Sequence, residues 1–339
     1  MPQHGFSQID GRLLENWVDA PSLRNNRLGD PARRLVRVYV PPDCESSSPL
    51  IVYLSSFTNS SLNMTGWKAF GENIPERVER LVKEGLMEPT VIAFPDCFTS
   101  LGGNQYIDSP ITGNWETFLI DDLIPHLIGH YPISQDPKRR AVMGFSSGGY
   151  GALIQGMRHS SEWGAIACHS ADMGFELLFP PEFPRVATAL QNFDFSPRGF
   201  LDSFEQAPQV DNEHLQILFI LAMAATYDPD PGTGNKIQLP FDLHTCEIIP
   251  ERWGKWLEHD PIHILGSPES LQNLRRLRGL YFDCGNRDQY QLQFGARRFT
   301  KLLETHSINH RYEEFEGTHS NVQKRLDTSL PFLSKCLNT

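Results

Sequence analysis

The chain has 339 residues, of which 40% are hydrophobic and 21% charged, as in an ordinary globular protein. Its 30 basic and 41 acidic residues give a formal net charge of −11, which argues against a nucleic-acid binder and against docking to anionic membranes. Residues 1–20 lack the apolar core of a targeting signal, and the longest apolar run, Ile217–Ala225, is too short to cross a bilayer. Six cysteines without a CxxC pair or zinc-like spacing favour a reduced compartment, so we expect a cytoplasmic protein with no metal and no other cofactor.

Short apolar runs alternate with helical patterns along the chain. Arg34–Val40 alternates polar and apolar residues like a half-buried strand, and two prolines end it. Six further runs predict strands: Leu50–Leu54, Thr90–Phe94, Ala141–Phe145, Ala165–Cys168, Leu280–Cys284 and Arg311–Phe315. The segments expected to be helical are Trp67–Glu84, Trp115–His130, Gly149–His159 and Tyr290–Thr305. This alternation predicts an α/β fold with a mostly parallel central sheet and helices on both faces.

Residues 172–265 interrupt this rhythm. The stretch contains ten of the 25 prolines and is too long for a simple connection. We therefore predict an inserted cap over the top of the sheet, between the two parts of the core, 1–171 and 266–339. The apolar run that begins at Ile217 would be a cap helix packing down onto the sheet; a core helix of the main domain is the alternative.

The strongest chemical signal is the G-x-S-x-G motif of residues 144–148. It follows a predicted strand and precedes a predicted helix, the context in which a serine occupies a sharp strand-to-helix turn. Small flanking residues allow that turn to pack, and the start of the helix favours developing negative charge at Ser146. The motif predicts Ser146 as a nucleophile, with a structural turn as the alternative.

A serine nucleophile needs a histidine base that a carboxylate orients. After a turn of this kind the acid comes next along the chain and the histidine last. Asp288 lies in the loop after the strand at 280–284 and is the expected acid, because functional groups gather at the carboxyl ends of parallel strands. Asp283, inside that strand, is the alternative, with a bracing role expected for it instead.

The base is expected after the last predicted strand. His319 follows a glycine turn there and precedes the terminal helix. His306 and His310 are near in sequence, but they lie at a helix end and before the strand, where we expect them to point elsewhere.

Two backbone N–H groups are needed to stabilise a tetrahedral intermediate. We expect one from Ser147, the residue after the nucleophile, and the other from the loop after Leu50–Leu54. Phe57 is the favoured donor in that loop, and Ser56 is the second choice.

Substrate contacts are predicted for Gln105, Tyr106 and His169. Gln105 and Tyr106 follow a strand end, although a plain turn explains them equally well, and His169 ends the strand after the nucleophile helix, where it is otherwise a structural histidine. The histidines of the 259–263 segment resemble a metal pair, but we expect this segment to anchor the end of the insertion, and no metal site is predicted.

The chain resembles the esterase D family of α/β-hydrolases, which includes S-formylglutathione hydrolases, enterochelin-type and feruloyl esterases, and the antigen 85 mycolyltransferases. The resemblance rests on residues 34–42, on Leu54-Ser55-Ser56-Phe57-Thr58, on the G-x-S-x-G-G-x-G-A-L match at 144–153, on the D-x-G-x-x-D match at 283–288 and on Gly317-Thr318-His319. It implies an α/β-hydrolase fold and acyl-ester chemistry, with the second aspartate, Asp288, as the acid. It also aligns Phe57 with an oxyanion donor.

These observations predict a serine carboxylic ester hydrolase of small or short-acyl esters that forms an acyl-enzyme intermediate. Asn59 stands where S-formylglutathione hydrolases carry a cysteine, so a thioesterase of that type is an alternative. An amidase or peptidase on the same fold and a non-catalytic binding protein are the others. The expected partner is a small-molecule ester, with a homo-oligomer left open.

Overall fold

The computed structural model describes residues 9–339 except 43, 45, 231, 233–236 and 321. Residues 1–8 of the segment searched for a targeting signal therefore lie outside the described residues. A central eight-stranded sheet has the order β1-β2-β4-β3-β7-β8-β9-β10. Its strands are β1 (Arg12–Asp19), β2 (Arg33–Val40), β3 (Leu50–Leu54), β4 (Val91–Pro95), β7 (Arg140–Phe145), β8 (Ala165–His169), β9 (Gly279–Gly285) and β10 (Arg311–Phe315).

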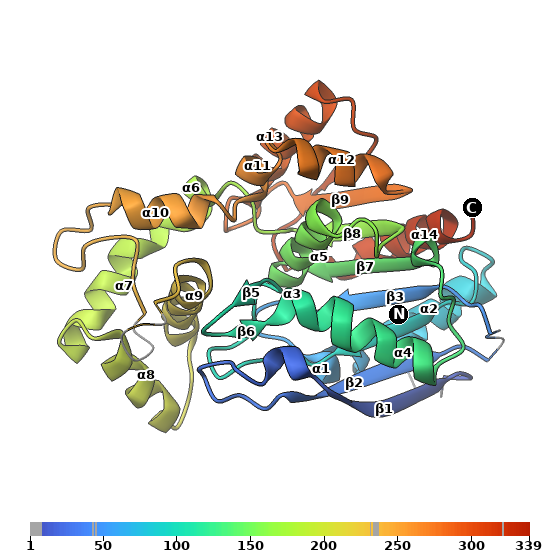
Figure 1. Cartoon of the computed structure of the whole chain (residues 1–339), viewed down its shortest axis with the longest axis horizontal. Helices are drawn as coiled ribbons and strands as arrows, with labels where there is room; N and C mark the ends of the chain where they lie inside the picture. The colour runs from blue at the N-terminus through green and yellow to red at the C-terminus, as the bar shows by residue number, and fades with distance from the viewer. Residues whose placement is uncertain (1–8, 43, 45, 231, 233–236, 321) are drawn as a thin grey trace.

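The sheet is parallel from β4 to β10, whereas β1 and β2 pair antiparallel at one edge. Every residue of β3, β4, β8 and β9 is buried, as expected for strands that helices cover on both faces. One apolar cluster includes residues of α5 (Ser147–Arg158) and α13 (Leu292–Thr305), and a separate cluster includes residues of α2 (Ile74–Lys83) and α14 (Leu326–Leu337). The predicted mostly parallel sheet with helices on both faces is therefore confirmed (Figure 1).

All seven predicted strands are present, each within one residue of its predicted ends. The sequence patterns missed β1, an edge strand whose residues are mostly exposed or half-buried, and the short hairpin of β5 (Asp108–Ser109) and β6 (Gly113–Asn114). The expected helix at 115–130 is divided into α3 (Trp115–Thr117), a wider π-helical turn (Phe118–Leu123) and α4 (Ile124–His130).

The helix expected from Trp67 begins only at Ile74. Asn73 and Glu76 form a reciprocal cap, in which the Asn73 side chain accepts from the Glu76 amide at 2.9 Å and the Glu76 side chain accepts from the Asn73 amide at 2.8 Å. Such a cap fixes a helix start, so residues before Asn73 form a bend and the short α1 (Ser61–Thr65) instead.

Residues 172–265 contain no strand of the central sheet among those the structure describes. They form α6 (Phe175–Leu178), α7 (Phe183–Leu190), α8 (Pro197–Gln206), α9 (Asn212–Tyr227), α10 (Pro250–Leu257) and α11 (Pro261–Ile264). Figure 1 shows α7 to α10 grouped at the end of the sheet toward which the arrows of β3 and β7 point. The apolar run at 217–225 lies in α9, which packs against the core through Phe219 and the Phe57 ring, with ring centres 4.9 Å apart.

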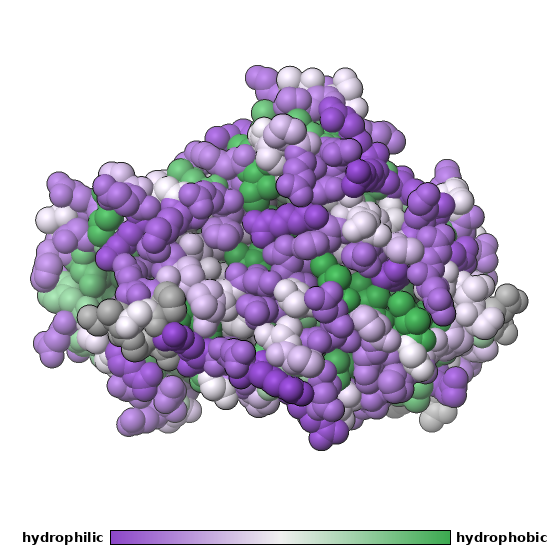
Figure 2. Space-filling model, viewed as in Figure 1, coloured by the Kyte–Doolittle hydropathy of each residue, from purple (hydrophilic) through white to green (hydrophobic). Residues whose placement is uncertain are grey.

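The surface in Figure 2 is mainly hydrophilic, with apolar residues in separate patches among the polar ones. Within the described part of the chain, no helix combines the length and the apolar character needed to cross a membrane. Helix α12 (Pro268–Arg276) connects α11, at the end of the insertion, to β9 of the central sheet.

Packing is very close where α5 crosses the end of β3. A Cβ atom on Gly148 would lie 2.2 Å from the backbone oxygen of Leu54, whereas one on Gly254, inside α10, would meet no atom within 4 Å. We therefore expect Gly148→Ala to lower the free energy of unfolding by at least about 2 kcal/mol, because backbone must move. Gly254→Ala, the matched control, should leave it unchanged or raise it by up to about 1 kcal/mol.

Urea titration of the two variants and the parent protein measures both effects. Equal stability of the two variants would contradict this account of how α5 packs on β3.

Candidate active site

Ser146 occupies the turn between β7 and α5 with a strained backbone. Its φ of 56° and ψ of −123° lie outside the regions that non-glycine residues favour. Its amide donates to the carbonyl of His169 at 2.9 Å, and its own carbonyl accepts from the Tyr150 amide at 2.8 Å. These bonds and the close packing of Gly148 hold the strained residue at the carboxyl end of the sheet, as the G-x-S-x-G pattern predicts.

The structure brings His319 and Asp288 together. The Nδ1 atom of His319 lies 2.8 Å from Oδ2 of Asp288, and both residues are buried. The second Asp288 oxygen accepts from the Tyr290 amide at 2.9 Å, which fixes the carboxylate. Since a carboxylate can only accept, Nδ1 carries the proton and Nε2 is left as a base.

The two loops that carry this pair are joined by backbone hydrogen bonds. The Asn286 amide donates to the Phe315 carbonyl and the Arg287 amide to the Gly317 carbonyl, both at 2.9 Å. The His319 ring packs against Phe145, the residue before Ser146, with ring centres 4.7 Å apart. The loops after β7, β9 and β10 therefore meet at one place, where the Asp288–His319 pair lies against the residue that precedes Ser146.

Asp283 belongs to a separate buried network. Its Oδ1 lies 2.8 Å from Nδ1 of His169, and its Oδ2 accepts from Nε of Arg325 at 2.9 Å and from the Tyr281 hydroxyl at 2.8 Å. Burial alone would raise the pKa of Asp283, but the His169 charge and these hydrogen bonds hold it below the usual value. The bracing role expected for Asp283 agrees with these contacts.

Ser329 completes this network through a 2.9 Å contact with Nε2 of His169. The arrangement has the residue types of a Ser-His-Asp triad, yet Ser329 and His169 have no exposed surface and Asp283 is 2% exposed. No substrate can reach it as it stands, so its role is to connect α14, β8 and β9.

The amides expected to form an oxyanion hole are those of Phe57 and Ser147. Neither amide donates a hydrogen bond to any residue in the described part of the chain. The Phe57 carbonyl accepts from the Gly103 amide at 2.7 Å, which fixes the orientation of this loop.

The three predicted substrate contacts are corrected by the structure. His169 is wholly buried and pairs with Asp283 and Ser329, because its side chain lies on the α14 face of the sheet. Tyr106 is 2% exposed, and its hydroxyl donates to the Ser55 carbonyl at 2.6 Å. Gln105 is also fully buried and donates to Oγ of Ser147 at 3.0 Å. Tyr106 and Gln105 therefore hold the loops around Ser146 in place through buried hydrogen bonds.

Sequence reasoning missed Asp172, which it placed only at the start of the insertion. Asp172 is 2% exposed and accepts from Nε2 of Gln105 at 3.3 Å. Burial raises its pKa from 3.8 to about 7, with His319 and the Gln105 hydrogen bond opposing and Asp288 adding to the rise. The available signal was its position, three residues beyond a strand that neighbours β7, at the edge that carries Ser146.

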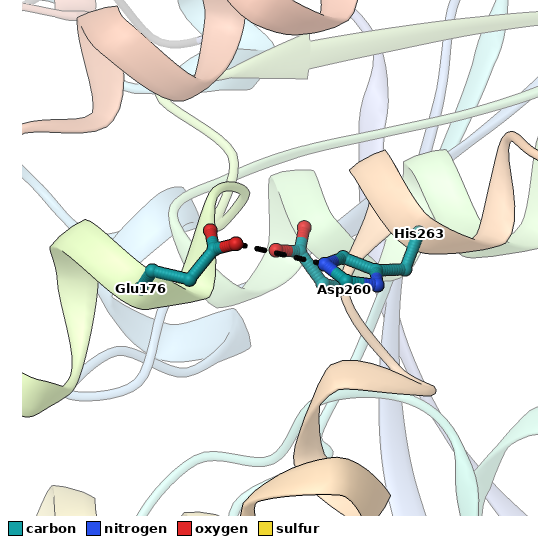
Figure 3. Close-up of side chains that lie close together, drawn as sticks. All are labelled: Glu176, Asp260 and His263. Atoms are coloured by element: carbon teal, nitrogen blue, oxygen red, sulfur yellow. Dashed lines mark ion pairs between the residues drawn. The ribbon is translucent and has the colours of Figure 1, made fainter.

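Glu176, Asp260 and His263 approach one another near α6 and α11 (Figure 3). Asp260 already accepts three backbone amides, from Gly174 and Ile262 at 3.0 Å and from Phe175 at 2.8 Å. Glu176 is paired with His263 at 3.6 Å and with Arg298 at 3.2 Å. These contacts anchor the end of the insertion, so we assign no metal site to this cluster.

The raised pKa of Asp172 makes stability depend on pH. The folded protein holds this proton up to about pH 7, whereas the unfolded chain releases it near 3.8, so the stabilising contribution is complete below 3.8 and is lost as the pH rises through about 7. Asn at this position has no charge to bury. The stability of Asp172→Asn relative to the parent should therefore increase from pH 5 to pH 8, by up to roughly 3 kcal/mol.

Urea unfolding of both proteins around pH 5 and around pH 8 measures this difference, in which the other titrating groups cancel. A difference that does not vary with pH would show that Asp172 titrates as an ordinary exposed carboxyl.

Solved structures share this fold at low sequence identity. A ferulic acid esterase structure covers 97% of this chain and 100% of its own, with a TM-score of 0.64 and 18% identity. An S-formylglutathione hydrolase (FrmB) from Staphylococcus aureus covers 97% and 99%, with a TM-score of 0.57 and 12% identity. The expected α/β-hydrolase fold is therefore confirmed.

One curated relative is Esterase Rv1288 from Mycobacterium tuberculosis (strain ATCC 25618 / H37Rv). It is 32% identical over 89 residues, which is 24% of this chain and only 18% of the relative's length.

The family model described as "Putative esterase" matches residues 31–330, which span β2 to α14. The match includes the strands on both sides of Ser146 and the loops that carry Asp288 and His319. This confirms the family to which residues 34–42 and 144–153 pointed, and the chain belongs to it.

Proposed function

We propose that this protein is a serine carboxylic ester hydrolase in which Ser146, His319 and Asp288 form the catalytic triad. The observation that carries the proposal is the hydrogen bond between His319 Nδ1 and Asp288 at 2.8 Å, beside a serine on a strained strand-to-helix turn. Membership of an esterase family supports the ester as substrate.

In the proposed reaction, Oγ of Ser146 attacks the ester carbonyl while Nε2 of His319 takes its proton. Asp288 stabilises the imidazolium that forms and keeps the ring oriented. The free amides of Phe57 and Ser147 stabilise the negative charge on the carbonyl oxygen. His319 then protonates the departing alcohol, leaving Ser146 acylated, and a water molecule that His319 activates releases the acid.

The insertion supports a preference for small or short-acyl esters. Phe219 of α9 packs edge-on against Phe57, next to the expected oxyanion donor, and Phe57 is only 8% exposed. Phe179 and Tyr227 extend this aromatic wall. A wall of packed rings limits the space for an acyl chain. It does not separate esters from thioesters or amides, because these substrates differ in chemistry rather than in size.

A reduced compartment, such as the cytoplasm, is proposed for the protein. None of the six cysteines, all of which the structure describes, forms a disulfide, and burial raises the pKa of Cys97, Cys168 and Cys284, which makes these thiols unreactive.

The triad is tested with a fluorophosphonate probe and a p-nitrophenyl ester. We expect the probe to label the parent protein at Ser146 and to leave Ser146→Ala unlabelled, with ester hydrolysis by the variant reduced at least about 1,000-fold and its melting temperature unchanged. A matched p-nitroanilide measures amidase activity and should be hydrolysed far more slowly than the ester. Labelling elsewhere, or hydrolysis within tenfold of the parent, would refute the assignment.

A pair of aspartates in the same strand-loop unit provides the control. Asp288→Asn should leave His319 in the wrong tautomer and reduce kcat by up to about 10,000-fold. Asp283→Asn should mainly lower stability, because it disturbs the contacts with His169 and Arg325. The reverse order of effects on kcat, with both variants folded, would identify Asp283 as the acid.

Acyl-chain length tests the role of the insertion. We expect kcat/KM to be highest for the acetate or butyrate p-nitrophenyl ester and to fall for octanoate and palmitate, since each poorly placed methylene costs roughly 1–3 kcal/mol. A maximum at octanoate or longer would show an open acyl channel beside Phe219 and refute the short-acyl preference.

A further inference from the structure

We propose that Asp172, positioned by Gln105, is a specificity-determining residue that binds an O–H or N–H donor group of the substrate close to the scissile bond. The preferred esters would then carry a hydroxyl or an ammonium group in the acyl or alcohol part. This inference rests on the proposed esterase function and names a substrate class for the same site.

Asp172 lies in the loop that directly supports the nucleophile turn. The loop follows His169, whose carbonyl accepts from the Ser146 amide at 2.9 Å. It also packs on the first turn of α5, where a Cβ on Gly149 would lie 2.8 Å from the His169 oxygen and 3.3 Å from Cα of Ala171. The backbone before Asp172 is therefore held firmly against the residues that surround Ser146.

Gln105 links Asp172 to the expected oxyanion donor. Its Nε2 atom donates to Oγ of Ser147 at 3.0 Å and to Oδ2 of Asp172 at 3.3 Å. The Asp172 carboxyl is thus two hydrogen bonds away from Ser147. On the other side it lies close enough to His319 and Asp288 for their charges to affect its pKa. Asp172 therefore lies beside the residues that are proposed to act on the ester.

The hydrogen-bonding capacity of Asp172 is mostly unused. Its Oδ1 atom receives no hydrogen bond from the described residues, and no lysine or arginine among them forms an ion pair with it. Oε1 of the neighbouring Gln105 is wholly buried without a partner. Tyr227 is near enough to Asp172 for the carboxyl to influence its pKa. Buried polar groups are normally paired, so the site lacks a donor.

Two other buried aspartates in the chain show how a structural carboxyl is satisfied. Asp260 accepts three backbone amides, and Asp283 has His169, Arg325 and Tyr281 as partners. Asp172 is buried as a residue but has one hydrogen bond of 3.3 Å, to Oδ2, and its unpaired Oδ1 is not one of the wholly enclosed polar atoms, so that oxygen stays accessible to a group that enters the site. It cannot be the triad acid either, because Nδ1 of His319 is already bonded to Asp288. A substrate-binding role accounts for both its burial and its unused oxygen.

The charge around Asp172 determines which donors it accepts. The titratable groups near it are His319, Asp288, Tyr227 and Tyr290, and His319 is paired with Asp288. Burial raises the pKa of Asp172 to about 7, so both forms are present at neutral pH. An ammonium group needs the ionised carboxylate, whereas a hydroxyl can bind either form.

The test compares esters that differ only in the donor. Methyl butanoate, its 2- and 3-hydroxy derivatives and its 2- and 3-amino derivatives vary the acyl part, and propyl acetate with 2-hydroxyethyl acetate varies the alcohol. The readout is the ratio of kcat/KM for the donor-bearing ester to that of its donor-free partner. We expect the parent enzyme to prefer at least one donor-bearing ester about tenfold or more. Asp172→Ala should reduce this ratio to near one.

Asp172→Asn separates the two kinds of donor and keeps the volume of the side chain. It should retain most of the preference for a hydroxyl, because an amide oxygen still accepts, and lose the preference for an ammonium group. In the parent enzyme, a preference for the 3-amino ester, whose ammonium group keeps its proton in this range, should increase with pH through about 7, whereas a preference for a hydroxyl ester should not. Asp202→Asn, at a half-buried residue of α8 that pairs with Arg198, is the matched control and should leave every ratio unchanged.

The outcomes distinguish this inference from the proposed function. A parent enzyme that labels with fluorophosphonate and hydrolyses the esters, but shows no donor preference, would overturn the inference and leave the esterase function standing. Ratios that are the same in Asp172→Ala and in the parent would overturn it too. A parent protein with neither labelling nor ester hydrolysis would refute the proposed function itself.

Discussion

The strained turn at Ser146 is the constraint on which the rest of the structure depends. A residue with φ of 56° and ψ of −123° persists only where its surroundings fix it. Gly144 and Gly148 provide that environment, because a Cβ on Gly144 would lie 2.3 Å from the carbonyl carbon of Gly148, and one on Gly148 would lie 2.2 Å from the Leu54 oxygen. The ends of β3, β7 and β8 must therefore stay in register around this turn, and the loops that follow them meet beside Ser146.

Three buried aspartates near this turn have different roles. Asp283 has three partners and connects β8 and β9 to Arg325, which holds the start of α14 in place. Asp288 lies at the end of the same strand unit, where it fixes the His319 ring. Asp172 has a single long hydrogen bond and a raised pKa. The number of hydrogen-bond donors around each aspartate thus determines its role: Asp283 braces the strands, Asp288 orients His319, and Asp172 keeps an oxygen available.

The insertion reaches the site through aromatic side chains. Phe219 packs on Phe57, and Phe179, Tyr227 and Trp256 continue the contact away from the sheet, with neighbouring ring centres 5.1 to 6.2 Å apart. Apolar residues of α9 belong to the same buried cluster as those of the core. Such packing favours a fixed wall, which is why acyl size and donor position are reasonable determinants of the proposed specificity.

The sequence by itself determined the parallel strands, the turn at Ser146 and the pairing of His319 with Asp288, because these follow from local patterns and from the order of strand ends along the chain. Tertiary structure alone decided where His169, Gln105 and Tyr106 point. His169 ends a fully buried strand, and only the packing of α14 and Ser329 against the opposite face of the sheet explains why its ring turns away from Ser146. The sequence could not show that Asp172 has only one hydrogen bond, because its partner lies 67 residues away. Identifying an unpaired donor or acceptor requires the positions of all its neighbours in space.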